Sequence, residues 1–153
     1  MTYVNSILQP GETVKAIGKP HWIIFGRACV LAVVGIVILV YGQNFTAQTR
    51  EFVLLAGWVV ILVAVLAFLH AWFIRWITEL SVTNHRVIYK RGFIRRHTVE
   101  MNMDKVETVN VDQSLFGRLL GYGTIRVLGT GQGIEGLEKV GSPIALRNAI
   151  TAR

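Results

Sequence analysis

The sequence predicts an α+β protein in which a two-helix transmembrane hairpin precedes an antiparallel β-sheet domain that ends in a helix. The hairpin is predicted by two apolar stretches, residues 28–49 and 52–74, that contain no Asp, Glu, Lys or Arg. The domain is predicted by a change from helical to alternating hydrophobic periodicity at Ile77. The resulting boundaries are 1–20 for a cytoplasmic N-terminal segment, 21–76 for the hairpin and 77–153 for the domain.

Composition divides the chain into an apolar half and a half with ordinary charge. Of its 153 residues, 52% are hydrophobic and only 16% are charged, against roughly 25% charged in an average soluble protein. From Trp76 onwards the charged share is close to that average. This division excludes a disordered chain, a disulfide scaffold and a plain soluble enzyme. The single cysteine, Cys29, cannot form an internal disulfide.

The two apolar runs are each long enough to cross a bilayer. A helix needs about 20 apolar residues for roughly 30 Å of hydrocarbon, and residues 21–41 and 52–76 reach that length. A cleaved signal peptide is the alternative for the first run, but the run is too long for the apolar region of such a signal. Aromatic and basic side chains near the span ends are the predicted membrane-interface anchors: Trp22, Arg27, Trp72, Arg75 and Trp76.

Charge placement predicts how the hairpin is oriented. The connecting residues 42–51 carry one cation, Arg50, offset by Glu51, whereas both outer flanks are rich in Lys and Arg. Cytoplasmic flanks of membrane helices carry such an excess. We therefore expect a multi-pass protein of the cell (inner) membrane with both termini cytoplasmic and a short external loop.

Small residues recur at helical spacing in both spans and permit close helix contact. They are Ala28, Ala32 and Gly35 in the first span and Ala64, Ala67 and Ala71 in the second. The pattern leaves two interpretations open, because these stripes could join the two helices to each other or to a neighbouring molecule.

Alternation after Ile77 predicts a meander of short strands. The first two strands turn at residues 83–85, where Asn84 tolerates a left-handed backbone. A second turn at Arg91-Gly92 leads into residues 93–101, and residues 106–111, 122–128 and 134–140 follow as strands.

Two short helices complete the predicted domain. Residues 114–120 predict a helix or turn closed by Gly121, and Ser142-Pro143 predicts a helix start with a capping hydroxyl and proline at the first helical position. Ile144, Leu146, Ala149 and Ile150 would give the last helix its apolar side.

The chain resembles the bacterial pleckstrin-homology-like membrane proteins, the YdbS-like group. The resemblance covers essentially the whole chain, and residues 113–124, QSLFGRLLGYGT, are its most specific part; LQPGE at 8–12 and LSVTNHRVI at 80–88 also carry it, as do Arg91-Gly92, VETV at 106–109, Pro143 and Ile150. It implies a curved antiparallel sheet closed at one corner by a helix, and it implies no enzyme activity or cofactor.

The residues themselves give little support for catalysis. The four histidines are scattered, with no Cys or carboxylate at metal-ligand spacing. Gly129, Gly131 and Gly133 lie between two predicted strands and lack the Lys-Ser/Thr of a phosphate-binding loop. We therefore expect a non-enzymatic binding or scaffold protein with no cofactor and no metal.

One basic cluster and one acidic segment are the candidate binding residues. The tentative lipid- or partner-binding cations are Arg86, Lys90, Arg91, Arg95 and Arg96; the tentative partner-binding acids are Glu100, Asp104, Glu107 and Asp112. Opposite charges on neighbouring segments suit head-to-tail pairing of copies or docking on a larger membrane complex. The alternatives are binding of anionic membrane lipids at the inner leaflet, an accessory role in a transporter or channel, and a simple solvated surface. Nucleic-acid binding is disfavoured because aromatic residues are sparse and the acids would repel phosphate.

Overall fold

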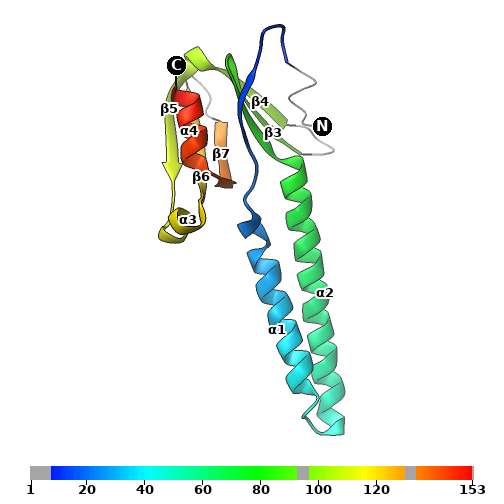
Figure 1. The fold of residues 1–153 in the computed structure, drawn as a ribbon. Coiled ribbons are helices and arrows are strands. Elements are labelled where there is room, and N and C mark those ends of the chain that lie inside the picture. The colour runs from blue at the N-terminus through cyan, green and yellow to red at the C-terminus, as the bar shows by residue number, and fades with distance from the viewer. Residues whose placement is uncertain (1–7, 93–96, 130–133, 153) are drawn as a thin grey trace. The chain divides into compact units, whose positions relative to one another are not determined.

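The computed structural model describes residues 8–92, 97–129 and 134–152 (Figure 1). The chain forms two compact units. The helical hairpin comprises Trp22–Phe73, and the β unit comprises the residues up to His21 together with those from Ile74 onwards. Two long apolar helices, antiparallel sheets and a C-terminal helix confirm the predicted fold class.

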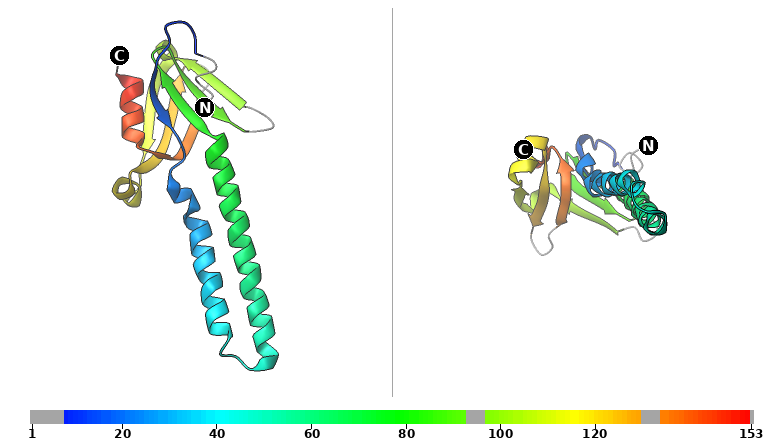
Figure 2. Two further views of the ribbon diagram at one scale, coloured as in Figure 1. Left: turned by 45° about the vertical axis from the view of Figure 1, so that its right-hand side comes forward. Right: turned by 90° about the horizontal axis from the view of Figure 1, so that it is seen from below.

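The hairpin consists of η2 (Trp22–Phe25), α1 (Gly26–Gly42) and the first part of α2 (Ala47–Ile77). The stretches Trp22–Gly42 and Ala47–Ile77 are long and apolar enough to cross a membrane. The connection between α1 and α2 is shorter than the predicted 42–51, because α2 already begins at Ala47. Figures 1 and 2 show the two helices side by side and antiparallel.

Small residues form the contact between α1 and α2. The buried positions recur every seven residues: Ala28, Gly35 and Gly42 on α1, and Gly57, Ala64 and Ala71 on α2. A Cβ atom at Gly35 would lie 2.7 Å from Cδ1 of Ile61, and one at Gly57 would lie 2.6 Å from Cδ2 of Leu39. The stripes therefore join the helices to each other, which decides between the two interpretations left open by the sequence.

The β unit contains two antiparallel sheets. The first has the order β1-β2-β3-β4 and the second β5-β6-β7. The strands are β1 (Val14–Gly18), β2 (Glu79–Thr83), β3 (Arg86–Arg91), β4 (His97–Asn102), β5 (Val106–Asp112), β6 (Tyr122–Gly129) and β7 (Ile134–Gly141). The short elements η3 (Met103–Lys105) and α3 (Leu115–Leu120) precede β5 and β6, and α4 (Pro143–Thr151) ends the fold.

The first strand comes from the segment before the hairpin. Gly18 pairs with Leu80 and Ile17 with Ser81, so β1 and β2 are neighbours. The hairpin is thus inserted in the sequence between two paired strands of one sheet. The predicted boundaries leave residues 14–18 outside the domain. Lys15 is the one polar residue among them, so alternation shows in the burial of this strand and not in its sequence.

The core lies between the two sheets and α4. Its buried side chains are Leu80, Val82, Val87, Tyr89, Met101, Ile125, Val127, Leu137, Val140, Leu146 and Ile150. Helix α4 packs against β1 and β2 of the first sheet and against β5 and β6 of the second. Leu146 and Ile150 provide its buried side, as predicted, whereas Ile144 is exposed.

Two local predictions are wrong. Asn84 does not have a left-handed backbone, since the described non-glycine residues with positive φ are Lys139 and Ser142. Its side chain instead accepts a hydrogen bond from the Thr13 amide and donates one to the Gly11 carbonyl. Pro143 does begin α4, but Ser142 makes no side-chain cap, because its own backbone is left-handed at φ 52°.

Candidate functional site

A tight turn brings an acidic side chain from the N-terminal segment into the β unit. The Glu12 amide donates to the Gln9 carbonyl at 2.9 Å, with Pro10 and Gly11 at the centre of the turn. Gly11 has φ 83°, which a type II turn requires at its third position and which glycine adopts without strain. The turn is closed a second time, since the Gln9 amide donates to Glu12 Oε2 at 2.9 Å.

The Glu12 carboxylate forms a buried ion pair with Arg86. Nε of Arg86 donates to Oε1 at 3.0 Å and Nη2 to Oε2 at 2.8 Å, and the Thr83 hydroxyl donates to Oε1 at 2.7 Å. The Glu12 side chain is only 1% exposed. The Arg86 hydrogen bonds outweigh the effect of burial and lower the pKa of Glu12 from 4.5 to about 2. The same bonds raise the pKa of Arg86.

Arg86 is therefore mainly a structural residue of the β unit. Its Nη1 donates to Glu100 at 2.8 Å, so the guanidinium lies between two carboxylates, and its side chain is 14% exposed. The sequence placed Arg86 in a basic binding cluster, but the structure turns it toward Glu12. Sequence reasoning missed Glu12 as a partner because it lies more than seventy residues away, across the hairpin.

The other predicted cations do not form one described patch. Lys90 is partly buried near the end of β3, and Arg91 is exposed at its last position, opposite His97 of β4. Arg95 and Arg96 lie outside the described residues.

The predicted acids occupy three elements. Glu100 on β4 is engaged by Arg86, and Asp112 at the end of β5 lies 3.2 Å from the Arg126 guanidinium in an exposed ion pair. Asp104 on η3 and Glu107 on β5 are exposed. Asp104 and Glu107 follow Asn102, the last residue of β4, whereas Arg91 pairs with His97, its first residue. Exposed charges of opposite sign therefore lie at opposite ends of β4, about 17 Å apart along the strand.

The most specific run of the sequence, residues 113–124, comprises α3 with its capping residues and the start of β6. The Ser114 hydroxyl accepts from the Gly117 amide at 3.0 Å and caps α3, as the predicted helix start implied. Gly121 ends α3 with φ 74°, the predicted glycine closure. The Gln113 side-chain amide donates to the Tyr122 carbonyl at 3.0 Å and ties both ends of the loop together.

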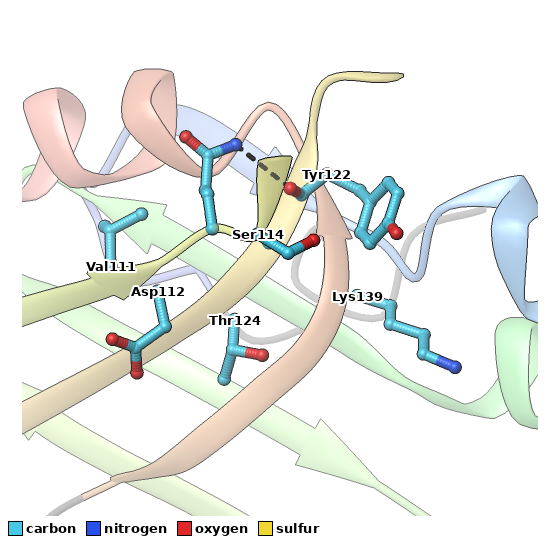
Figure 3. A pocket seen from close by; sticks show the side chains of 8 residues that line it. Val111, Asp112, Ser114, Tyr122, Thr124 and Lys139 are labelled. Atoms are coloured by element: carbon cyan, nitrogen blue, oxygen red, sulfur yellow. Dashed lines mark hydrogen bonds between the residues drawn. The ribbon is translucent and has the colours of Figure 1, made fainter. Parts of the chain in front are cut away.

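A shallow depression of about 710 Å³ lies beside this loop. Figure 3 shows its lining, with the Gln113 to Tyr122 hydrogen bond drawn as a dashed line. The lining residues are Val111, Asp112, Gln113, Ser114, Tyr122, Gly123, Thr124 and Lys139. The Ser114 hydroxyl is committed to its cap, and the lining offers hydrogen-bonding groups without a His or Cys. These hydrogen-bonding groups are suited to binding polar groups.

The predicted interface anchors lie on or beside the long helices. The Trp22, Trp72 and Trp76 side chains are 53%, 55% and 65% exposed. Arg27 is exposed near the start of α1, and Arg75 is partly buried near the end of α2. Aromatic residues near span ends are typical of membrane interfaces.

The described residues contain no group of three His, Cys, Asp or Glu side chains able to hold a metal ion.

The sequence did not reveal that α3 exposes large apolar residues, since periodicity over six residues does not show which face of a helix is buried. The exposed residues are Leu115, Phe116, Leu119 and Leu120.

Comparison with known proteins gives a family but no individual relative. No curated protein and no solved structure matches the chain. The family described as "Bacterial PH domain" matches residues 25–152, which is most of the chain but excludes β1 and Glu12. The narrower YdbS-like assignment stays a prediction. With a four-stranded and a three-stranded antiparallel sheet and a C-terminal helix packed on both, the chain belongs to the bacterial PH domain family.

Proposed function

We propose that this protein is a non-enzymatic, membrane-anchored scaffold whose PH-like unit self-associates at the cytoplasmic face of the cell (inner) membrane. Membership of the bacterial PH domain family supports a binding module. The observation that carries self-association is the separation of exposed charge along β4, with Arg91 near one end and Asp104 and Glu107 beyond the other.

The hairpin is inserted between the paired strands β1 and β2, so short connections join the proposed membrane anchor to the β unit. Gly18 and Leu80 are paired, so both connections to the hairpin leave the β unit from the same end of one strand pair. The connecting residues 43–46 contain no charge, whereas Lys15, Lys19 and the cations after Arg75 flank the other ends. This asymmetry favours cytoplasmic termini.

Head-to-tail contact suits charges arranged in this way. A positive end on one copy meets a negative end on the next, and a heterologous contact of this kind closes into a ring where the rotation permits. Strand β4 is also an edge of the first sheet among the described strands, and edge strands accept partners through backbone hydrogen bonds. Docking on another membrane complex would use the same two charged ends.

Cross-linking of the full chain in native membranes tests this proposal. A membrane-impermeant cross-linker should give dimers and higher multiples in inside-out vesicles and none in right-side-out vesicles. Glu107→Arg or Arg91→Glu alone should lower the cross-linked fraction several-fold, because each places like charges at the contact. The double variant should restore it by exchanging the charges.

Glu138→Arg is the matched control, because Glu138 is an exposed carboxylate on β7, a strand that pairs with neither β4 nor β5. It should leave cross-linking unchanged. Cross-linking that is equal in all variants, or a chain that stays monomeric in inside-out vesicles, would contradict self-association through these residues.

A further inference from the structure

Helix α3 presents its large apolar side chains to the outside of the β unit. Leu115, Phe116 and Leu119 are 83%, 73% and 82% exposed, and they occupy little more than one helical turn. The residue that α3 buries is Gly117. A single exposed leucine is ordinary on a protein surface, but a contiguous apolar group of this kind marks a contact site.

The backbone fixes this outward orientation. A Cβ atom at Gly117 would lie 2.7 Å from the Tyr122 carbonyl oxygen, so the inner face of α3 has no room for a side chain. The Ser114 cap, the left-handed Gly121 and the hydrogen bond from the Ser142 amide to the Gly121 carbonyl hold both ends of α3. The apolar residues are thus held outward on a rigid support rather than left in a loose loop.

Helix α3 lies at the end of the β unit where the chain leaves for its first apolar helix. The Tyr122 ring, just after α3, stacks on the His21 ring with centroids 5.6 Å apart. The His21 amide donates to the Lys139 carbonyl, and the Gly141 amide donates to the Lys19 carbonyl at 3.2 Å. Lys139 has a left-handed backbone at φ 51° within the irregular part of β7.

Trp22, the next residue after His21, begins the first apolar stretch. Figures 1 and 2 show α3 and the C-terminal end of α4 at opposite ends of the second sheet. Since α3 is joined to Tyr122 through Gly121 alone, it lies on the same side of the β unit as His21, the last residue before that stretch.

In the membrane anchoring proposed above, the start of the first apolar helix lies at the membrane interface. The polar layers add about 5–8 Å on each side of the hydrocarbon core, and amphipathic helices bury their apolar face about 5–10 Å into this boundary. Arg118 on α3 is exposed, as are Lys19 and Lys139 beside the exit point. Cations around an apolar tip suit anionic headgroups.

We infer that α3 inserts Leu115, Phe116 and Leu119 into the headgroup and acyl boundary of the membrane that the two long helices cross. This third contact would fix the orientation of the β unit against the lipid surface. The inference rests on the membrane anchoring proposed above and is independent of self-association through Arg91 and Glu107.

Spin labels on the full chain in nanodiscs test the contact. The discs hold one copy each and contain a mixture of phosphatidylglycerol and phosphatidylcholine. In a Cys29→Ser background, single labels are placed at Phe116→Cys on α3, at Leu128→Cys as a matched control, and at Leu62→Cys on α2. Leu128 is also apolar and exposed, but it lies six residues along β6 from Tyr122, about 20 Å away.

The measured quantity is the ratio of label accessibility to oxygen, which partitions into lipid, over accessibility to a water-soluble nickel complex. The ratio at position 116 should be several-fold higher than at 128 and should approach that at 62. Equal ratios at 116 and 128, with a high ratio at 62, would overturn the α3 contact and leave the anchoring intact. A low ratio at 62 would instead overturn the anchoring itself.

A second copy of the chain is the other possible occupant of α3. In detergent micelles or discs that hold several copies, that occupant would broaden the spectrum of the label at 116 by spin–spin interaction, and dilution with unlabelled chain would remove the broadening. Such broadening, together with a low oxygen ratio in single-copy discs, would assign α3 to a protein contact and overturn the lipid contact.

Discussion

The helical hairpin and the β unit are each held together by a different kind of interaction. The contact between α1 and α2 is made by small residues and by the backbone approach that they permit. The β unit joins its N-terminal segment to β2 and β3 through the Glu12 and Arg86 ion pair. In the proposed membrane setting, lipid is as apolar as leucine, so burial of apolar area would not drive the helices together. In the β unit, the Glu12 and Arg86 ion pair is shielded from water, which strengthens its hydrogen bonds. These bonds specifically join the N-terminal segment to β2 and β3.

The largest expected effect is the loss of the Glu12 carboxylate. Glu12→Ala leaves the buried Thr83 and the partly buried Arg86 without the acceptor that they share, and breaking a buried ion pair in this way destabilises by about 3–5 kcal/mol. Hydrogen-exchange protection of the β1 and β2 amides in the full chain, held in detergent micelles, should fall accordingly. The hairpin amides should keep their protection, because α1 and α2 do not use this pair.

Glu138→Ala is the matched control, since it removes an exposed carboxylate from the same unit. If Glu12→Ala and Glu138→Ala changed protection of β1 equally, the ion pair would not be the link between the N-terminal segment and the sheet.

A smaller effect is expected from crowding the hairpin. Gly57→Leu adds a side chain where a Cβ alone would lie 2.6 Å from Leu39, and overpacking of this kind costs about 1–3 kcal/mol. Intrinsic tryptophan fluorescence, followed during titration with SDS, should report loss of the native hairpin at a lower SDS fraction. Ala56→Leu, at an exposed position of α2, is the control that introduces the same leucine side chain at a position that is not buried. An equal shift in both variants would contradict close packing at Gly57.

The smallest effect is the pH dependence of the β unit. The pKa of Glu12 is lowered from 4.5 to about 2 on folding, so the unfolded chain takes up the proton first. The stabilisation is complete above about pH 4.5 and is lost as the pH falls toward 2, with about 1–2 kcal/mol lost between pH 7 and pH 3.

Exchange protection of β1, measured at both pH values and corrected for intrinsic exchange, checks this expectation. Glu12→Gln has no carboxylate at this position, so it should show a weaker acid dependence than the natural chain. Identical acid dependence in both chains would remove Glu12 as the source.

The sequence predicted the elements well where local pattern determines them. The two long apolar helices, the strands after Ile77, Gly121 at the end of α3 and Pro143 at the start of α4 all follow from periodicity and backbone preference. It did not predict that β1 belongs to the sheet, because this pairing joins residues on either side of a long apolar insertion.

The candidate sites were less predictable, because they depend on which side chains meet. Arg86 was expected to face a lipid or a partner, but its partner Glu12 could be identified only after β1 had been placed beside β2. The apolar residues of α3 are compatible with a helix that buries them and with one that exposes them. The close approach of Gly117 to the Tyr122 carbonyl decides between them, and that distance exists only in the folded chain.

The insertion of the hairpin between β1 and β2 also bears on biosynthesis. Strand β1 leaves the ribosome first, and residues 19–78 must follow before β2 can pair with it. At about 5–20 residues per second, β1 waits roughly 3–12 s for its neighbour. If the hairpin spans the membrane as proposed, pairing further requires both strands to be on one side of the bilayer. A chain that inserted only one of the two helices could then not complete its first sheet.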